Sequence, residues 1–446
     1  MDVEGELNRK KAVLGFRDEG GDWYALDNAA IIMPAVSRGV DTSLFRLSAT
    51  LRAPVRLAAL QAALDRTAAR FPYFVVELRR GFFWHHLVPH RRRPRVEADP
   101  TSPCQGFDMG RRGTLLFRVR ARDRTIACEY SHIITDGTGG LRFLKNLVAE
   151  YLRQIDGGAM TGSDPDLLDL DAPPDPEETE DAYNRHYPGR YPFPPAEPFA
   201  FHLGGPLLPK GSYRVTTGVI PLAPALAKAR EFGVSLTELL VAAYLEALQN
   251  LWFAAPERER RRASTLSVEV PVNMRAFCPT RSNRNFSLFV HASLDLRLGR
   301  REFPEIVAKV HHQLRHDIDL QGMKRHMTRN VRGGRALFIR AIPLVLKAPV
   351  MKYLYARFGM SIISGVLSNL GAVTLPEPYA SSVERFTIAP PPSRLTRTGA
   401  VCLSWKDRLF LSFGSLGRER ELERLVFTRL QALGLDVALE CNFEES

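Results

Sequence analysis

A strand, a glycine-rich turn and an amphipathic helix follow one another between residues 126 and 155, and they constrain the fold more than any other feature. Residues 126–130 are predicted to form a strand, and the turn Ser131-His132-Ile133-Ile134-Thr135-Asp136-Gly137 follows directly. Beyond it, apolar residues recur every three or four positions, which predicts one buried face of a helix. These residues are Leu141, Leu144, Val148, Tyr151 and Ile155. We therefore expect a sheet with a helix packed on it, and one imidazole and one carboxylate where they meet.

The remaining elements mix strands and helices without strict alternation. Alternation over 45–51 predicts a strand, and the apolar spacing over 55–71 predicts a helix that stops at Pro72. In the second half, Ser235 and Glu238 form a capping-box pattern at the start of a helix that runs to about residue 252. A last helix is expected over 420–433. This pattern favours an α+β (mixed α/β) fold.

An acidic, proline-rich stretch divides the chain. From 157 to 211 the composition shifts toward proline and acidic residues, as in Asp171-Ala172-Pro173-Pro174-Asp175-Pro176. Such composition is typical of a linker or a long surface excursion. We therefore predict an N-terminal lobe over 1–156, a linker or excursion over 157–211, and a C-terminal lobe over 212–446.

The net charge of the chain limits the classes of binding partner that we expect. The chain of 446 residues has a formal net charge of +12, which favours an anionic partner or reflects arginine-rich solvated faces. No nucleic-acid-binding motif accompanies the charge, so we expect no nucleic acid. The five cysteines have no paired spacing, and the N-terminus has no secretory pattern. No apolar run is long enough to span a membrane, and we expect a cytoplasmic protein.

His132 has the chemistry of a general base. A neutral imidazole has an ordinary pKa of about 6.5, which suits proton removal near neutral pH. Glycines at 137, 139 and 140 are expected to permit positive φ and a tight reversal, and Thr138 to cap the following helix. A histidine that merely caps or packs beside the turn is the alternative interpretation.

Four motifs together resemble a known superfamily. The run from Glu129 to Gly140, with Phe143-Leu144 behind it, resembles the active-site signature of the chloramphenicol-acetyltransferase-like superfamily. Within that group the chain is similar to bacterial alcohol acetyltransferases and to condensation domains. Three further runs agree, in the family's order. They are Leu26-Asp27-Asn28-Ala29-Ala30 with Met33-Pro34, Pro271-Val272-Asn273-Met274-Arg275 with Arg284-Asn285-Phe286, and Leu367-Ser368-Asn369-Leu370-Gly371.

The resemblance implies a two-lobed fold with an active-site tunnel between the lobes. In it His132 would deprotonate a hydroxyl or amine acceptor, which attacks a thioester directly without a covalent acyl-enzyme. Asp136, beside Gly137, would be structural and would pair with Arg275 from the other lobe, whose guanidinium can hold a carboxylate through two hydrogen bonds. The donor would be acyl-CoA or an acyl-phosphopantetheine on an acidic carrier protein. No tightly bound cofactor is implied.

Two positions leave alternatives open. Condensation domains usually have two adjacent histidines, but Ser131 precedes His132 here, which slightly favours ester over amide formation. Ser368 and Asn369 are candidate oxyanion donors, although Asn369 and Gly371 could simply build a turn. Asn273 and Asn285 are expected to tie loops and strand ends.

Three further interpretations complete the analysis. The first is an acyltransferase acting on a small or lipid-like alcohol or amine. The second is a free-standing condensation-like enzyme that makes amides, and the third is a non-catalytic binding protein.

His312 and His316 lack a third ligand, so no metal site is predicted. Residues 335–355 are expected to form a packed helix interrupted at Pro343 and Pro349, in preference to a helix that associates weakly with a membrane surface.

Overall fold

The structure of the protein is a computed structural model that describes residues 23–37, 39, 41–157, 163–336, 339 and 341–443. The N-terminal residues from which we expect no secretory signal lie outside these ranges. Within them, no helix combines the length and the apolar character needed to cross a bilayer.

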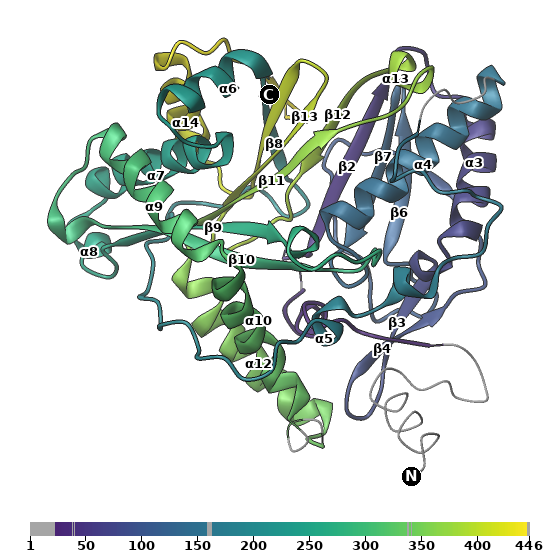
Figure 1. Ribbon diagram of the computed structural model, residues 1–446, viewed down its shortest axis with the longest axis horizontal. Helices are drawn as coiled ribbons and strands as arrows, with labels where there is room; N and C mark the ends of the chain where they lie inside the picture. Colours follow the sequence, from purple (N-terminus) through teal and green to yellow (C-terminus); the bar gives the residue numbers. More distant parts are fainter. Residues whose placement is uncertain are drawn as a thin grey trace.

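The first of two large sheets has five strands in the order β12-β2-β7-β6-β5 (Figure 1). The strands are β2 Leu44–Leu51, β5 Val96–Ala98, β6 Phe117–Arg122, β7 Thr125–Ser131 and β12 Val383–Ala389. Helices α3 (Leu57–Arg70) and α4 (Gly137–Asp156) cover one face of this sheet. The alternation predicted for β2 is present, because Phe45 and Leu47 join the core beneath α4 while Arg46 and Ser48 line a polar cleft on the other face.

The second sheet has seven strands in the order β10-β9-β11-β13-β14-β8-β15. The strands are β8 Arg214–Pro221, β9 Thr265–Asn273, β10 Ser287–Asp295, β11 Gly365–Val373, β13 Thr398–Trp405, β14 Arg408–Ser415 and β15 Ala438–Cys441. Its core includes α7 (Leu236–Ala254), α9 (Phe303–Asp317) and α14 (Glu421–Ala432). The predicted capping box starts α7, since Ser235 Oγ accepts from the Glu238 amide at 3.3 Å.

The possible turn at Asn369 and Gly371 lies inside a single strand, because β11 runs without interruption through Gly371. The pairing with β13 shifts register between Asn369 and Ala372, and Gly371 has a φ of +81°. A bulge therefore absorbs the turn residues, because glycine reaches this conformation without strain.

The two sheets are joined by an exchanged strand. β12 belongs to the C-terminal half of the chain, yet it pairs with β2, placing Ile388 opposite Leu47. The lobe boundaries predicted near 156 and 211 follow the chain and do not account for this crossing.

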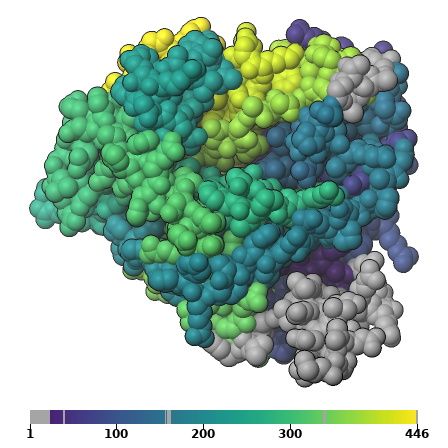
Figure 2. Space-filling view, viewed as in Figure 1, coloured from purple at the N-terminus to yellow at the C-terminus, as the bar shows by residue number. Residues whose placement is uncertain are grey.

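The segment between the halves is packed rather than loose over much of its length. It contains the short helices η2 (Pro176–Thr179) and α5 (Ala182–Arg185). Glu178 is 4% exposed, and the Tyr183 hydroxyl donates to the Ser287 carbonyl at 2.5 Å. Figure 2 shows later residues of this segment, coloured between blue and teal, crossing the face of the molecule.

A third, three-stranded sheet has the order β1-β4-β3 and lies near helices α10 and α12 at the lower edge of Figure 1. The elements are β1 Tyr24–Ala25, β3 Val76–Arg80, β4 His85–Pro89, α2 Met33–Val36, α10 Leu320–Arg335 and α12 Leu344–Phe358. The expected interruption is present at Pro343, but the expected packing and the expected interruption at Pro349 are wrong. α12 begins after Pro343, continues through Pro349, and buries only Leu344 and Lys347. Phe338 and Arg340 lie outside the described residues.

Short helices complete the described chain. They are α6 Leu222–Glu231, α8 Glu257–Arg260, α13 Tyr379–Ser382, η1 Pro72–Phe74, η3 Met274–Ala276, η4 Leu296–Leu298 and η5 Met360–Ile362.

Candidate active site

The turn after β7 is fixed by hydrogen bonds to the end of its own strand and to Ser43, which directly precedes β2. The His132 amide donates to the Ser43 carbonyl at 3.0 Å. The Ser131 hydroxyl accepts from the Ile133 amide at 3.2 Å, and its carbonyl accepts from the Ile134 amide at 3.0 Å. Ser131, which stands where condensation domains usually have a histidine, therefore helps to build the turn.

Asp136 is the centre of the loop scaffold. Its Oδ1 accepts from the amides of Thr138 and Gly139, both at 3.1 Å. Its Oδ2 accepts from the Phe286 amide at 2.9 Å and from Arg275 Nη1 at 2.8 Å. Asp136, and not Thr138 as the sequence predicted, is therefore the N-cap of α4. Burial acts to raise the pKa of this carboxyl, but Arg275 and the amide donors hold it below its ordinary value.

The predicted ion pair between Asp136 and Arg275 is present, with a different geometry. One guanidinium nitrogen contacts the carboxylate, where two hydrogen bonds were expected. Nη2 instead donates to the carbonyls of Ser282 at 2.9 Å and Arg284 at 2.6 Å. Arg275 thus joins the His132 turn to the loop between β9 and β10, and so connects the two lobes.

The glycines after Asp136 serve close approach rather than positive φ. They lie within α4, and none of them is among the described residues with a left-handed backbone. A Cβ on Gly139 would lie 2.1 Å from the Asn283 carbonyl oxygen, and one on Gly137 would lie 2.7 Å from a methyl carbon of Leu370. The N-terminal turn of α4 can therefore contact the other lobe only without side chains at these positions.

His132 is held as a neutral imidazole. Its ring contacts the Phe45 ring of β2 in a tilted arrangement, with 4.6 Å between the centroids. Burial lowers the pKa of His132 below 6.5, while the charge of Asp136 and hydrogen bonds with Asn285 and the Thr135 backbone partly offset this effect. The imidazole is consequently unprotonated at neutral pH and able to accept a proton.

Asp27 and Asn285 form a support for His132 that the sequence analysis left without a role in the site. Asn285 Nδ2 donates to the His132 carbonyl at 2.8 Å and to Asp27 Oδ2 at 2.9 Å. Asp27 is fully buried, with Arg284 Nε at 3.6 Å, and burial raises its pKa to about 6. Both residues lie in the motifs that resemble the superfamily, but only the structure brings these distant motifs together behind the histidine.

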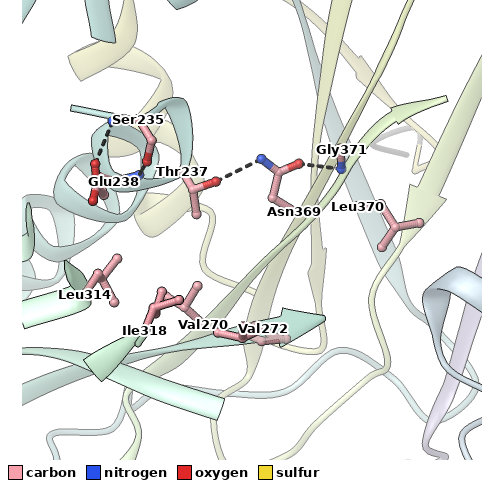
Figure 3. Close-up of a pocket in the computed structure, with 11 residues that line it drawn as sticks. Ser235, Thr237, Glu238, Val270, Val272, Leu314, Ile318, Asn369, Leu370 and Gly371 are labelled. Atoms are coloured by element: carbon pink, nitrogen blue, oxygen red, sulfur yellow. Dashed lines mark hydrogen bonds between the residues drawn. The ribbon is translucent and has the colours of Figure 1, made fainter. Parts of the chain in front are cut away.

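A cavity of about 320 Å³ adjoins the turn through Leu370, whose side chain contacts Gly137. Its wall combines apolar side chains with polar groups at the start of α7 (Figure 3). The lining residues are Ser235, Thr237, Glu238, Val270, Pro271, Val272, Leu314, Ile318, Asn369, Leu370 and Gly371.

The two oxyanion candidates differ in their surroundings. Asn369 Nδ2 donates to Thr237 Oγ1 at 2.9 Å, and its Oδ1 accepts from the Gly371 amide at 2.8 Å (Figure 3). The Asn369 side chain therefore holds the bulge of β11, and one of its two amide protons is not used in these bonds. Ser368 is half-buried in β11. Asn273 holds the loop after β9, as expected, because its Oδ1 accepts a hydrogen bond from the Arg275 amide at 3.1 Å.

Metal ligands do not gather at the site. Over the described ranges, no group of three or more His, Cys, Asp or Glu side chains could hold a metal ion. His312 and His316 are exposed on α9.

Solved structures resemble this chain over nearly its whole length. Polyketide synthase associated protein 5 from Mycobacterium tuberculosis has a TM-score of 0.57 at 13% identity, covering 93% of this chain and 98% of its own. The wax ester synthase/diacylglycerol acyltransferase from Marinobacter aquaeolei VT8 has a TM-score of 0.53 at 14% identity, covering 92% and 99%. The starter condensation domain of rhizomide synthetase has a TM-score of 0.53 at 12% identity, covering 93% and 97%.

No family model and no curated protein sequence matches the chain. At identities this low, the structural likeness establishes the fold alone. The chain therefore has the two-lobed, condensation-domain-like fold that its resemblance to the chloramphenicol-acetyltransferase-like superfamily predicts.

Proposed function

We propose that this protein is an acyltransferase in which His132 is the general base. The proposal rests on the different hydrogen bonding of the two titratable side chains in the turn. Four N–H donors occupy the Asp136 carboxylate, so that group has no free role in proton transfer. His132 is left as the titratable side chain of the turn, and its imidazole is neutral at physiological pH.

The reaction is direct attack on a thioester. The imidazole takes the proton of the acceptor hydroxyl, and the oxygen attacks the thioester carbonyl carbon. The tetrahedral oxyanion collapses, the carbon–sulfur bond breaks, and the thiolate leaves with the proton returned by the imidazolium. The products are an ester and a free thiol. Ser368 is the proposed oxyanion donor, with the remaining amide proton of Asn369 as the second candidate.

Acyl-CoA or an acyl-phosphopantetheine is the proposed donor, as a substrate rather than a resident cofactor. Both are anionic, as is an acidic carrier protein, and the chain has a net charge of +12. An alcohol is the favoured acceptor, because Ser131 replaces the first histidine and a similar structure is named a wax ester synthase/diacylglycerol acyltransferase. The apolar part of the cavity wall suits a lipid-like molecule.

The test is a screen of acyl-CoA and acyl-carrier donors against alcohols and amines, with free thiol and acylated product both measured. Wild type is expected to release thiol only when an acceptor is present, and His132→Ala is expected to lose at least about a hundredfold in rate. His312→Ala is the matched control, since His312 is exposed on α9.

Each other outcome has a defined meaning. Full activity in His132→Ala would refute the mechanism. Amide products alone would favour the condensation-like alternative, and absence of turnover with every donor would favour a binding protein with this fold.

A further inference from the structure

Helix α12 turns an apolar face toward solvent. Val345, Leu346, Val350, Tyr353 and Leu354 are between 45% and 65% exposed. By helical spacing they cover roughly half of the helix circumference, with the buried Leu344 opposite them and the buried Lys347 at the edge of this side, beside Leu354. A helix on a globular surface normally buries its apolar face, so this inverted arrangement requires an apolar partner.

The tip of the β3–β4 hairpin extends the same surface. Phe82 and Phe83 are 71% and 43% exposed and contact each other edge to face. The Phe82 carbonyl accepts from the Leu344 amide at 2.8 Å, and Lys347 Nζ lies 3.2 Å from the centre of the Trp84 ring. We call the exposed side chains of α12 together with Phe82 and Phe83 the apolar face.

Both segments that build the apolar face lack acidic residues. The 57 residues from Leu320 to Pro376 contain nine Lys or Arg and no Asp or Glu. The 19 residues from Leu78 to Val96 contain six Arg and again no acid. Arg80 and Lys352 are exposed within them. A surface with this balance attracts an anionic partner and repels a second copy of a chain whose net charge is +12.

We propose that the apolar face docks on the surface of an anionic lipid bilayer. The apolar side chains of α12 and the two phenylalanines would enter the boundary between headgroups and acyl chains, and the flanking cations would contact lipid phosphates. The helix would lie on the bilayer, since its 15 residues are too few to cross it.

The proposed docking surface is close to the support of the active-site histidine. α12 packs against α2, which lies in the same N-terminal segment as Asp27. Asp27 holds Asn285, which in turn binds the His132 carbonyl. Docking does not depend on the proposed function, because it is measured without any reaction.

Sedimentation of the full-length protein with vesicles tests the proposal. Phosphatidylcholine vesicles with and without phosphatidylglycerol are compared. Wild type is expected to bind the anionic vesicles and to be released as NaCl rises from about 0.05 M to about 0.5 M. Leu346→Glu/Val350→Glu is expected to weaken binding at least about tenfold, without loss of fold, because both side chains are already exposed.

Leu298→Glu is the matched control. Leu298 is 72% exposed in η4, away from the apolar face, and its substitution is expected to leave vesicle binding unchanged. Failure of wild type to bind anionic vesicles at low salt would overturn the proposal, as would equal binding by the double variant. Lipid-free dimerisation that the double variant abolishes would assign the face to a second copy instead.

Discussion

At the scale of single residues, the proposed mechanism rests on the different environments of Asp136 and His132. The buried Asp136 charge has four donors, one of them a guanidinium, so it remains ionised and structural. His132 has the opposite environment, because burial lowers its pKa and keeps the imidazole neutral. Two titratable groups four residues apart therefore have opposite electrostatic environments.

The pH dependence of the reaction follows from the pKa of His132. Only the neutral imidazole can accept a proton, so activity is lost as pH falls through the pKa of the folded enzyme. Because burial lowers this pKa from 6.5, the acid limb of kcat/KM is expected to have its midpoint below pH 6.5. Rates across a pH series with one donor and one acceptor measure it.

Asn285→Ala sharpens this prediction. The hydrogen bond of Asn285 raises the pKa of His132, so its removal is expected to move the acid limb to still lower pH while kcat falls. Asn330→Ala, an exposed position on α10, is the control and should leave the limb in place. An unchanged limb in Asn285→Ala would mean that Asn285 holds only the backbone.

At the scale of elements, the first turn of α4 is the most closely packed part of the site. Thr135 Oγ1 donates to the Asn283 carbonyl at 2.7 Å, and the same carbonyl oxygen lies against Gly139. The helix start is therefore pressed against the loop of the other lobe, and its position fixes that of His132.

A single methyl group tests this contact. Gly139→Ala would place a Cβ 2.1 Å from a backbone oxygen, so the lobes must separate locally. We expect a lower urea midpoint, equivalent to about 1–3 kcal/mol, and loss of activity. Gly333→Ala is the control, since Gly333 is helical in α10, exposed, and has open space around it. That variant is expected to be neutral or to gain up to about 1 kcal/mol. Equal behaviour of the two variants would contradict the close-packing argument.

Sequence periodicity predicted these elements better than it predicted their contacts. The β2 strand, the α3 and α4 helices and the α7 capping box follow from local pattern, because their apolar spacing and caps are local properties. The exchange of β12, the bulge at Gly371 and the close approach at Gly139 depend on partners far along the chain. The exposed face of α12 was mispredicted because an apolar pattern does not reveal whether solvent or protein lies opposite.

The candidate site likewise combines residues that local motifs predicted with contacts that they did not predict. His132, Asp136 and Arg275 were predicted from motifs whose residue types resemble one superfamily. The contact of Asp27 with Asn285 joins residues 258 positions apart and has no local pattern. Resemblance could mark those positions, but only the folded chain places Asn285 behind the histidine.

At the scale of the whole molecule, the segment 157–211 connects the two lobes through hydrogen bonds. Glu178 accepts two hydrogen bonds from Arg70 of α3, at 2.8 and 2.6 Å, and one from the Tyr73 hydroxyl at 2.6 Å. Its carbonyl accepts from the Asn283 amide at 2.9 Å, and Asn283 Nδ2 donates to the same Tyr73 hydroxyl at 2.7 Å. One buried carboxylate thus joins the N-terminal lobe to the loop that packs on Gly139.

Removing that carboxylate is expected to weaken both stability and catalysis. Glu178→Ala leaves the Arg70 guanidinium, 6% exposed, buried without its partner, and breaking a buried pair from one side costs about 3–5 kcal/mol. Urea unfolding measures this loss, and acyl transfer by the folded variant should fall because Tyr73, whose hydroxyl holds the Asn283 side chain, loses the carboxylate that fixes it. Glu384→Ala breaks the half-exposed pair with Arg124 and should cost at most about 1 kcal/mol with activity unchanged. If Glu178→Ala were as stable and active as this control, the lobes would be held together by the exchanged β12 strand and the Arg275 contacts without help from the connecting segment.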